Sequence, residues 1–179
     1  MITSWSRRKE DIATKVGWRI ITRKHFVTAD GIEHDFDTIG AVGAQVAAVV
    51  ALTEDNRIII AEQFRTGPEC IMQDLPGGMV DSGEAPIDAA RREMIEETGY
   101  EVGSIEFLGM ASDDGYSNVE RHFFLARDCK QIGDQQLEHA EEIELKLLTI
   151  QEVLNNARTN RMTDALAVYY ASDELKKLL

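Results

Sequence analysis

The feature that most constrains the fold is the stretch from Pro86 to Thr98, which carries both a start and a stop for an α-helix. Proline suits the first helical turn, where its missing N–H has no intrahelical partner, and Gly99 suits the C-terminal cap. Ile87, Ala90 and Met94 recur on one side of this stretch at about 100° per residue. The sequence therefore predicts a helix from Pro86 to Thr98 with one apolar side.

The other side of this helix is acidic. Glu93, Glu96 and Glu97 occupy positions i, i+3 and i+4, so three negative charges share one surface. Like charges at this spacing destabilise a helix by about a few tenths of a kcal/mol per pair. A hard cation such as Mg²⁺ prefers carboxylate oxygens and would relieve this repulsion. Glu84 precedes the helix and can reach the same region, and Arg92 can orient a glutamate through a bidentate pair.

The whole run resembles a known motif. It reads Gly78, five residues, Glu84, seven residues, and then Arg92-Glu-Met-Ile-Glu-Glu-Thr-Gly-Tyr100. This resembles the Nudix box, G-x5-E-x7-R-E-U-x-E-E-x-G-U, in which U is a bulky apolar residue. Every fixed position matches, with Tyr100 a mild departure at the last apolar position. The resemblance implies an α/β/α sandwich with a mixed β-sheet, and hydrolysis of nucleoside diphosphates linked to another group.

The resemblance also implies a metal site. Glu93 and Glu97 would be the main ligands of Mg²⁺, with Glu96 and the carbonyl of Gly77 assisting. Gly77 and Gly78 let the backbone approach an ion closely. Mn²⁺ is an alternative ion. An ordinary solvated helix face is the competing interpretation of such a cluster, and the match along the whole box favours the metal.

Flanking segments are similar to the ADP-ribose and nucleotide-sugar pyrophosphatase branch of the family. They are Trp18 to Arg23, Ala29 to Gly31, Arg57 to Arg65 and Leu75 to Gly78. In that branch an arginine at the place of Arg65 reaches the phosphate or the distal sugar of the substrate. A surface ion pair is the alternative for Arg65. The loop from Ala111 to Asn118 lacks a proline common in the branch, which leaves other nucleoside-diphosphate sugars open, and Tyr116 in this loop is a further candidate for substrate contact.

In this branch a glutamate on a later loop deprotonates the attacking water. The segment from Ala140 to Glu144 resembles the family pattern before a strand and places Glu141 at the catalytic position. Glu138 and Glu142 are close alternatives, and His139 is another because an imidazole titrates near neutrality. A solvated acidic loop is the competing interpretation of each single glutamate. The predicted catalytic residues are Glu141, Glu138, Glu142, Glu96 and Arg92.

The remaining chain fits one layered α/β domain with an added hairpin. Strands are predicted at 16–27, 34–39, 43–52, 57–63, 74–79, 104–110, 121–126 and 143–149, and two further helices at 150–158 and 163–178. We expect residues 1–40 to form an N-terminal extension and residues 41–179 to form the hydrolase domain. The extension exposes apolar residues such as Ile20, Ile21 and Phe26, which predicts a homodimer. Trp5, expected in a mobile tail, is a candidate to stack on a nucleobase.

Composition limits the partners. The formal net charge is −13, from 32 acidic and 19 basic residues, and such a field repels nucleic acid and anionic membranes. No apolar run approaches the roughly 20 residues of a membrane span, and the first residues are too polar for a signal peptide. Cys70 and Cys129 have no motif spacing and are expected to be reduced thiols. A cytoplasmic protein is therefore expected.

Together these features predict a Mg²⁺-dependent hydrolase of ADP-ribose or a related nucleoside-diphosphate sugar. The products would be a nucleoside monophosphate and a sugar phosphate. One alternative is a hydrolase that removes unwanted nucleoside triphosphates. A second is a ligand-sensing Nudix domain without catalysis, which the intact box disfavours.

Overall fold

The computed structural model describes residues 3–137 and 142–179. The chain divides into two compact units. Residues 1–45 and 111–120 form the first, called here the N-terminal unit, and residues 46–110 and 121–179 form the second, called the core unit. The N-terminal unit therefore extends beyond residue 40 and also includes a segment that lies far along the chain.

The N-terminal unit is an antiparallel sheet. Its strands are β1 (Ser6–Arg7), β2 (Ile12–Val16), β3 (Arg19–Val27) and β4 (Glu33–Ile39), with β3 paired to each of the other three. The expected hairpin of β3 and β4 is confirmed. The expectation of one strand from residue 16 to residue 27 is wrong, because residues 17 and 18 form a turn that separates β2 from β3.

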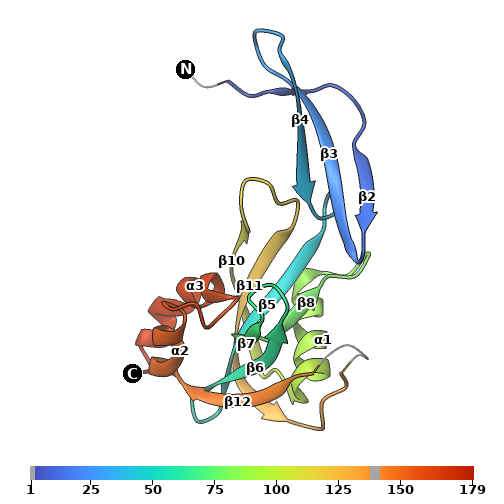
Figure 1. The fold of residues 1–179 in the computed structure, drawn as a ribbon. Helices are drawn as coiled ribbons and strands as arrows, with labels where there is room; N and C mark the ends of the chain where they lie inside the picture. The colour runs from blue at the N-terminus through green and yellow to red at the C-terminus, as the bar shows by residue number, and fades with distance from the viewer. Residues whose placement is uncertain (1–2, 138–141) are drawn as a thin grey trace. The chain divides into compact units, whose positions relative to one another are not determined.

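The core unit has three layers (Figure 1), in which α1 covers one face of a sheet and α2 and α3 cover the other. The sheet runs in the order β10-β11-β5-β6-β12, with β7 paired to β6, β8 to β5 and β9 to β11. Its elements are β5 (Gln45–Thr53), β6 (Arg57–Arg65), β7 (Cys70–Asp74), β8 (Gly77–Met79), β9 (Tyr100–Glu101), β10 (Ser104–Ser112), β11 (Glu120–Gln131), β12 (Glu144–Thr149), α1 (Pro86–Thr98), α2 (Ile150–Asn156) and α3 (Ala165–Lys176). The predicted α/β/α sandwich is confirmed.

Apolar burial explains this arrangement. The run from Ala47 to Leu52 on β5 is at most 2% exposed, as expected for a strand covered on both faces. Met94, on the apolar side of α1, belongs to the same buried cluster as Val49 of β5 and Ala126 of β11. The predicted bounds of α1 are confirmed, with Pro86 in its first turn and Gly99 as its cap. One strand was expected over 74–79, but Pro76, which lacks an N–H for a ladder, lies between β7 and β8.

The structure also bears on membrane spans and on the two cysteines. Among the described residues, no helix is long and apolar enough to cross a bilayer. Cys70 and Cys129 are both free thiols, and Cys129 is buried.

Candidate active site

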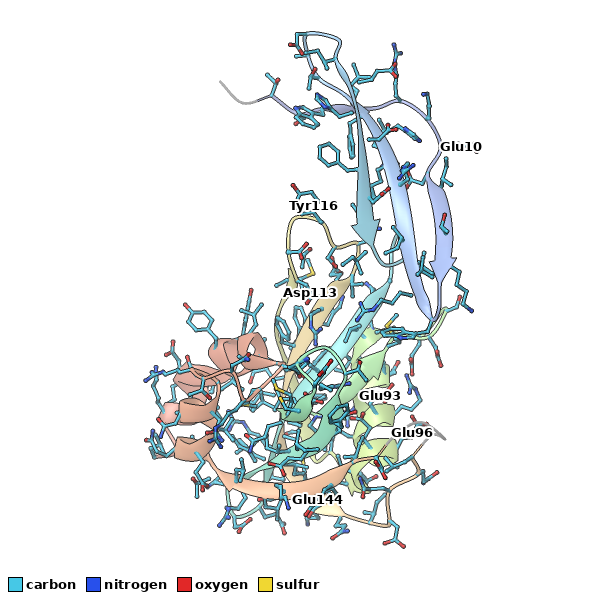
Figure 2. The ribbon with its side chains drawn as sticks, in the orientation of Figure 1. Glu10, Glu93, Glu96, Asp113, Tyr116 and Glu144 are labelled. Atoms are coloured by element: carbon cyan, nitrogen blue, oxygen red, sulfur yellow. The ribbon has the colours of Figure 1, made fainter. Side chains whose placement is uncertain are left out.

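Helix α1 carries an arginine and three glutamates in its second half. Met94 is fully buried, so packing against the sheet fixes the rotation of the helix about its axis. Arg92, Glu93 and Glu96 are partly exposed, whereas Glu97 is buried. Figure 2 shows Glu93 and Glu96 projecting from α1. The apolar pattern therefore determines where the carboxylates gather.

Arg92 links this cluster. Its Nε and Nη2 donate to the two carboxylate oxygens of Glu84, each at 3.0 Å. Its Nη1 donates to Glu93 at 2.8 Å and to Glu96 at 2.9 Å. Nη2 also donates to the carbonyl oxygen of Met79 at 3.0 Å. The bidentate pair expected of Arg92 thus forms with Glu84, and one guanidinium holds three carboxylates and the end of β8.

These contacts change the acidity of the partners. Hydrogen bonding to Arg92 lowers the pKa of the Glu84 carboxyl below its ordinary value, and the bond from the Asp81 backbone acts in the same direction. The hydrogen bond to Glu84 is also the main cause that raises the pKa of Arg92, with Glu93 and Glu96 adding to it. Arg92 and Glu84 are therefore both charged near neutral pH.

The glycines of β8 bring the backbone against the same helix. The N–H of Gly77 donates to Oε2 of Glu97 at 2.8 Å, and Glu97 is only 7% exposed. A Cβ atom built on Gly78 would lie 2.3 Å from Oε1 of Glu93, so a larger residue would displace that carboxylate from this position. The box glycine therefore allows the carboxylate of Glu93 to lie directly against β8.

The side chains of the box are of the chemical type that binds a hard divalent cation. The guanidinium of Arg92 binds the carboxylates of Glu84, Glu93 and Glu96, and the carboxylate of Glu97 accepts a bond from the N–H of Gly77. Carboxylate oxygens are the ligands that Mg²⁺ prefers. Within residues 3–137 and 142–179, no group of three or more His, Cys, Asp or Glu side chains is arranged to hold a metal ion. The metal ligands therefore remain predictions.

The candidate bases lie in the segment between β11 and β12. Glu138, His139 and Glu141 are outside the described residues. Glu142 is described and is exposed, directly before Ile143 and the start of β12. The choice among these residues stays a prediction.

Arg65, at the end of β6, binds a buried carboxylate. Its Nη2 lies 2.6 Å from Oδ2 of Asp74, whose side chain is 2% exposed while that of Arg65 is 42% exposed. Burial raises the pKa of the Asp74 carboxyl, and hydrogen bonds from Thr163 and the charge of Arg65 oppose this shift. The ion pair considered for Arg65 is present, and the solvent-exposed part of its side chain leaves the substrate contact as a prediction.

Asp74 belongs to a polar network that the sequence did not predict. Thr163 donates its hydroxyl to Asp74 and also contacts Oδ2 of Asp164 at 3.2 Å. Asp164 pairs in turn with Arg121 of β11. This network joins β7, β11 and the start of α3. In the sequence, Asp74 lay at the start of the strand predicted over 74–79, and no pattern there indicated these partners.

Trp5 and Tyr116, the other predicted substrate contacts, belong to the N-terminal unit. Trp5 was expected in a tail, but it stacks on His34 of β4 with ring centroids 5.0 Å apart and planes 18° apart. Tyr116 lies 6.3 Å from the ring of Phe36. Both remain accessible, with Trp5 45% and Tyr116 58% exposed. Their binding roles remain predictions.

Comparison with known proteins identifies relatives. The chain is 33% identical over 123 residues to the methanol dehydrogenase activator of Bacillus methanolicus, covering 68% of this chain and 66% of that protein. It is 29% identical over 124 residues to the ADP-ribose pyrophosphatase of Bacillus subtilis, covering 68% and 67%. The matched region thus spans about two thirds of the length of these relatives.

Fold similarity extends further. A crystal structure of an ADP compounds hydrolase superposes with a TM-score of 0.81 and 17% sequence identity, covering 99% of this chain and 97% of that chain. A model of the NUDIX domain matches residues 43–168, which include the whole box and its flanking strands. The box, the sandwich and this match agree, and the chain belongs to the Nudix family of hydrolases.

Proposed function

We propose that this chain hydrolyses the diphosphate of a nucleoside diphosphate that is linked to a sugar or a similar group. The products are a nucleoside monophosphate and a sugar phosphate. The observation that carries the proposal is that Arg92 of α1 binds the carboxylates of Glu84, Glu93 and Glu96, while Glu97 on the same helix accepts a bond from the N–H of Gly77. The similarity to proteins named ADP-ribose pyrophosphatase and ADP compounds hydrolase supports it.

The residues that would hold Mg²⁺ are Glu93, Glu96 and Glu97, together with the carbonyl of Gly77. Mn²⁺ is the alternative ion. A divalent ion held by these residues would neutralise charge on the diphosphate and lower the pKa of a bound water. Within the chain, Arg92 fixes the carboxylates of Glu93 and Glu96 through its bonds of 2.8 and 2.9 Å. Such fixed charges reduce the reorganisation that the reaction would otherwise require.

A separate carboxylate acts as the general base. Glu141 is the proposed residue, with Glu138 and Glu142 as alternatives and His139 as the next candidate. The lone pairs of a carboxylate that binds a cation are poor proton acceptors, so the base is drawn from a loop outside the box. The substitutions Glu138→Gln, Glu141→Gln and Glu142→Gln identify it. One of them should lower kcat by about 10²- to 10⁴-fold, with Mn²⁺ binding unchanged.

Substrate contacts come from residues outside the box. Arg65 provides a cation for the phosphate or the distal sugar; its side chain is 42% exposed, and its Nη2 lies 2.6 Å from Oδ2 of Asp74. Trp5 and Tyr116 provide accessible aromatic rings for the base. Substitution of a true contact by alanine should raise KM, whereas Tyr169→Ala, at a 74% exposed tyrosine on α3, is the matched control.

The protein is proposed to act as a cytoplasmic homodimer that does not bind nucleic acid or membranes. Ile20, Ile21 and Phe26 are only partly exposed, so the apolar side chains offered to a second copy differ from those expected. Ile12, Val16 and Trp18 are instead 55%, 60% and 81% exposed. Ile12 and Val16 line a shallow groove of ≈260 Å³ in the N-terminal sheet. Sedimentation at micromolar concentration giving only a 20.0 kDa species would reject the dimer.

The deciding experiment is a screen of nucleoside-diphosphate compounds with Mg²⁺, with products identified by chromatography. Release of a nucleoside monophosphate and a sugar phosphate from ADP-ribose or another nucleotide sugar is the expected result. Removal of divalent ions by a chelator should abolish turnover, and Mg²⁺ or Mn²⁺ should restore it. Turnover of nucleoside triphosphates alone would indicate a clean-up hydrolase. Binding without turnover in any metal would indicate a sensing domain.

A further inference from the structure

The connection between β7 and β8 is a short buried segment. Leu75 is 3% exposed, and the carbonyl oxygen of Pro76 accepts a bond of 2.9 Å from the N–H of Val49 on β5. Asp74 precedes this segment and Gly77 follows it. Each residue spans at most about 3.6 Å, so the Cα atoms of Asp74 and Gly77 are at most about 11 Å apart. Packing against β5 therefore holds Asp74 close to Gly77.

Each end of this segment contacts a residue of the proposed function. The N–H of Gly77 donates to Oε2 of Glu97 at 2.8 Å, and Glu97 is one of the proposed metal ligands. Oδ2 of Asp74 lies 2.6 Å from Nη2 of Arg65, the proposed cation for the phosphate or the distal sugar. One buried connection of two residues thus relates Arg65 to the metal-binding helix.

Arg65 pairs with a much less mobile partner. Its side chain is 42% exposed, whereas that of Asp74 is 2% exposed. Nε of Arg65 is buried and has no hydrogen-bond partner in the part of the chain that the structure describes. A long arginine side chain has many rotamers, and pairing of its planar guanidinium with a fixed carboxylate limits them. The position of Arg65 therefore depends on Asp74.

The segment before α3 fixes Asp74 in turn. The hydroxyl of Thr163 donates to Oδ1 of Asp74, and the N–H of Thr163 donates to the carbonyl oxygen of Gln73 at 3.2 Å. The N–H of Gln73 donates to the carbonyl oxygen of Arg161 at 2.8 Å. These bonds hold the carboxylate through Oδ1, so that Oδ2 is left to face Arg65.

We propose that Asp74 is a positioning residue, which acts on substrate binding by orienting the guanidinium of Arg65 relative to the metal-binding helix. The inference rests on the proposed function, in which Arg65 contacts the phosphate or the distal sugar. Asp74 itself is buried and touches neither substrate nor metal. A purely structural role would lower thermal stability and would leave substrate affinity unchanged at a temperature where the protein is folded.

Asp74→Asn tests this role, because it keeps the acceptor for Thr163 and removes the charge that pairs with Arg65. Burial raises the pKa of Asp74 and the charge of Asp164 adds to this, so a neutral side chain should leave the fold intact. Arg65→Ala should raise KM for ADP-ribose by about 10- to 100-fold, as for a lost bond to a charged group. Asp74→Asn should raise it by about 3- to 10-fold, because the cation remains but is misplaced. In both variants kcat should stay within about twofold of wild type.

Asp164→Asn is the matched control. Asp164 is also a buried acid of this network and also pairs with an arginine, Arg121, but that arginine is not a proposed substrate contact. The control should lower Tm and keep the wild-type KM. An equal rise of KM in Asp164→Asn would assign the effect to the network as a whole and would overturn the inference.

A second pair of variants tests the charge itself. Asp74→Glu and Asp74→Gln have nearly the same size, and only the first retains a carboxylate. KM should therefore be lower in Asp74→Glu than in Asp74→Gln. This comparison carries the test if Asp74→Asn does not fold, and equal KM values in the two variants would contradict the inference.

Equilibrium binding of ADP-ribose to chelator-treated protein separates this inference from the proposed function, because it requires no turnover. Asp74→Asn should weaken binding in the wild-type background and should have no further effect in Arg65→Ala. Wild-type affinity in Asp74→Asn beside a loss in Arg65→Ala, or an additive loss in the double variant, would overturn the inference alone. Wild-type affinity in Arg65→Ala would reject the substrate contact of Arg65 and the inference with it. Product release from nucleoside-diphosphate compounds judges the hydrolysis independently of both.

Discussion

The two units of the chain are held together in different ways. In the core unit, β5, β6, β11 and α1 bury Ala, Val, Ile, Met and Phe side chains almost completely. In the described residues of the N-terminal unit, only Thr22 and Thr38 are buried. The hydroxyl of Thr38 donates to the carbonyl oxygen of Thr22 at 2.9 Å, and Thr22 donates to the carbonyl oxygen of Gly40 at 2.9 Å. One unit therefore depends on apolar packing and the other on hydrogen bonds.

This difference indicates which unit can define a precise site by itself. Close packing fixes α1 and so fixes the carboxylates on its exposed side. The N-terminal sheet instead exposes Ile12, Val16 and Trp18 to a degree that a small isolated sheet seldom tolerates. We therefore expect chemistry to depend on the core unit, and the N-terminal unit to respond more to assembly and concentration.

The largest expected effect is the loss of kcat caused by Glu97→Gln, a substitution in the core unit. If Glu97 binds the metal, kcat should fall by about 10³-fold or more, because metal stabilisation is worth several kcal/mol. The amide oxygen of glutamine can still accept the bond that Gly77 donates at 2.8 Å, so both units should stay folded. Circular dichroism and steady-state kinetics measure this, with Glu106→Gln on β10 as control. A rate above about half of wild type would exclude Glu97 as a ligand.

Removal of a buried side chain from the core unit should lower the free energy of unfolding more than removal of an exposed side chain from the N-terminal unit. Met94→Ala in the core unit leaves a cavity and should lower the free energy of unfolding by about 2 to 5 kcal/mol. Met94→Leu, which conserves volume, should cost less than about 1.5 kcal/mol. Ile12→Ala in the N-terminal sheet, where Ile12 is 55% exposed, should change it by about 0.5 kcal/mol or less. Denaturant titration measures all three, and equal losses from Met94→Ala and Ile12→Ala would contradict the comparison.

A concentration series adds to this test. If a second copy covers Ile12, the effect of Ile12→Ala should shrink as the protein is diluted, because assembly contributes less to apparent stability at low concentration. The effect of Met94→Ala should not depend on concentration in this way.

In the N-terminal unit, substitution of a polar residue should lower the free energy of unfolding instead. Asn118 donates to the hydroxyl of Thr38 and to the carbonyl oxygen of Gly40, both at 2.8 Å, and accepts from Lys24. Asn118→Ala should cost about 1 to 3 kcal/mol, because buried partners lose their donors. Asn118→Asp keeps the shape and the acceptor for Lys24 but also loses the donors, so it should cost a similar amount. Loss in Asn118→Ala with none in Asn118→Asp would assign the effect to Lys24.

The core unit was largely predictable from sequence because its signals are local. Proline and glycine at its two ends define α1, and an uninterrupted apolar run defines β5. The N-terminal strand β2 was missed because all five of its residues are exposed, so burial left no alternation to identify it. The turn at residues 17–18 was missed for the same reason.

The site was predictable only as far as the box extends. The carboxylates and Arg92 lie within one helix and one loop, so their spacing determines their contacts. The pair of Arg65 and Asp74 depends on the pairing of β6 with β7 and on the segment before α3, which no local pattern gives. Acidic residues in the segment between β11 and β12 are too alike for sequence to choose one.

The smallest expected effect is the change in Tm when one arginine–carboxylate pair is broken in each unit. In the N-terminal unit, Arg23 binds Asp37 through bonds of 2.7 and 2.8 Å, with side chains 52% and 49% exposed. In the core unit, Arg92 binds Glu84 through two bonds of 3.0 Å, with side chains 30% and 17% exposed. Water screens the first pair more strongly. Glu84→Gln should therefore lower Tm by about 1 to 3 °C at pH 7, and Asp37→Asn by less.

The pH dependence of these two losses tests their electrostatic origin. Hydrogen bonding to arginine lowers the pKa of Glu84 from 4.5 and that of Asp37 from 3.8. A carboxyl whose pKa is lower in the folded state stabilises the fold above its ordinary pKa, and this stabilisation is lost as the pH falls through the folded value. The Tm difference between wild type and Glu84→Gln should thus be constant above 4.5 and shrink below it, while that of Asp37→Asn should shrink only below 3.8. Calorimetric scans from neutral to acid pH measure both differences, and a loss for Glu84→Gln that persists at the most acid pH would mean that packing around Arg92, rather than charge, makes the core pair the stronger one.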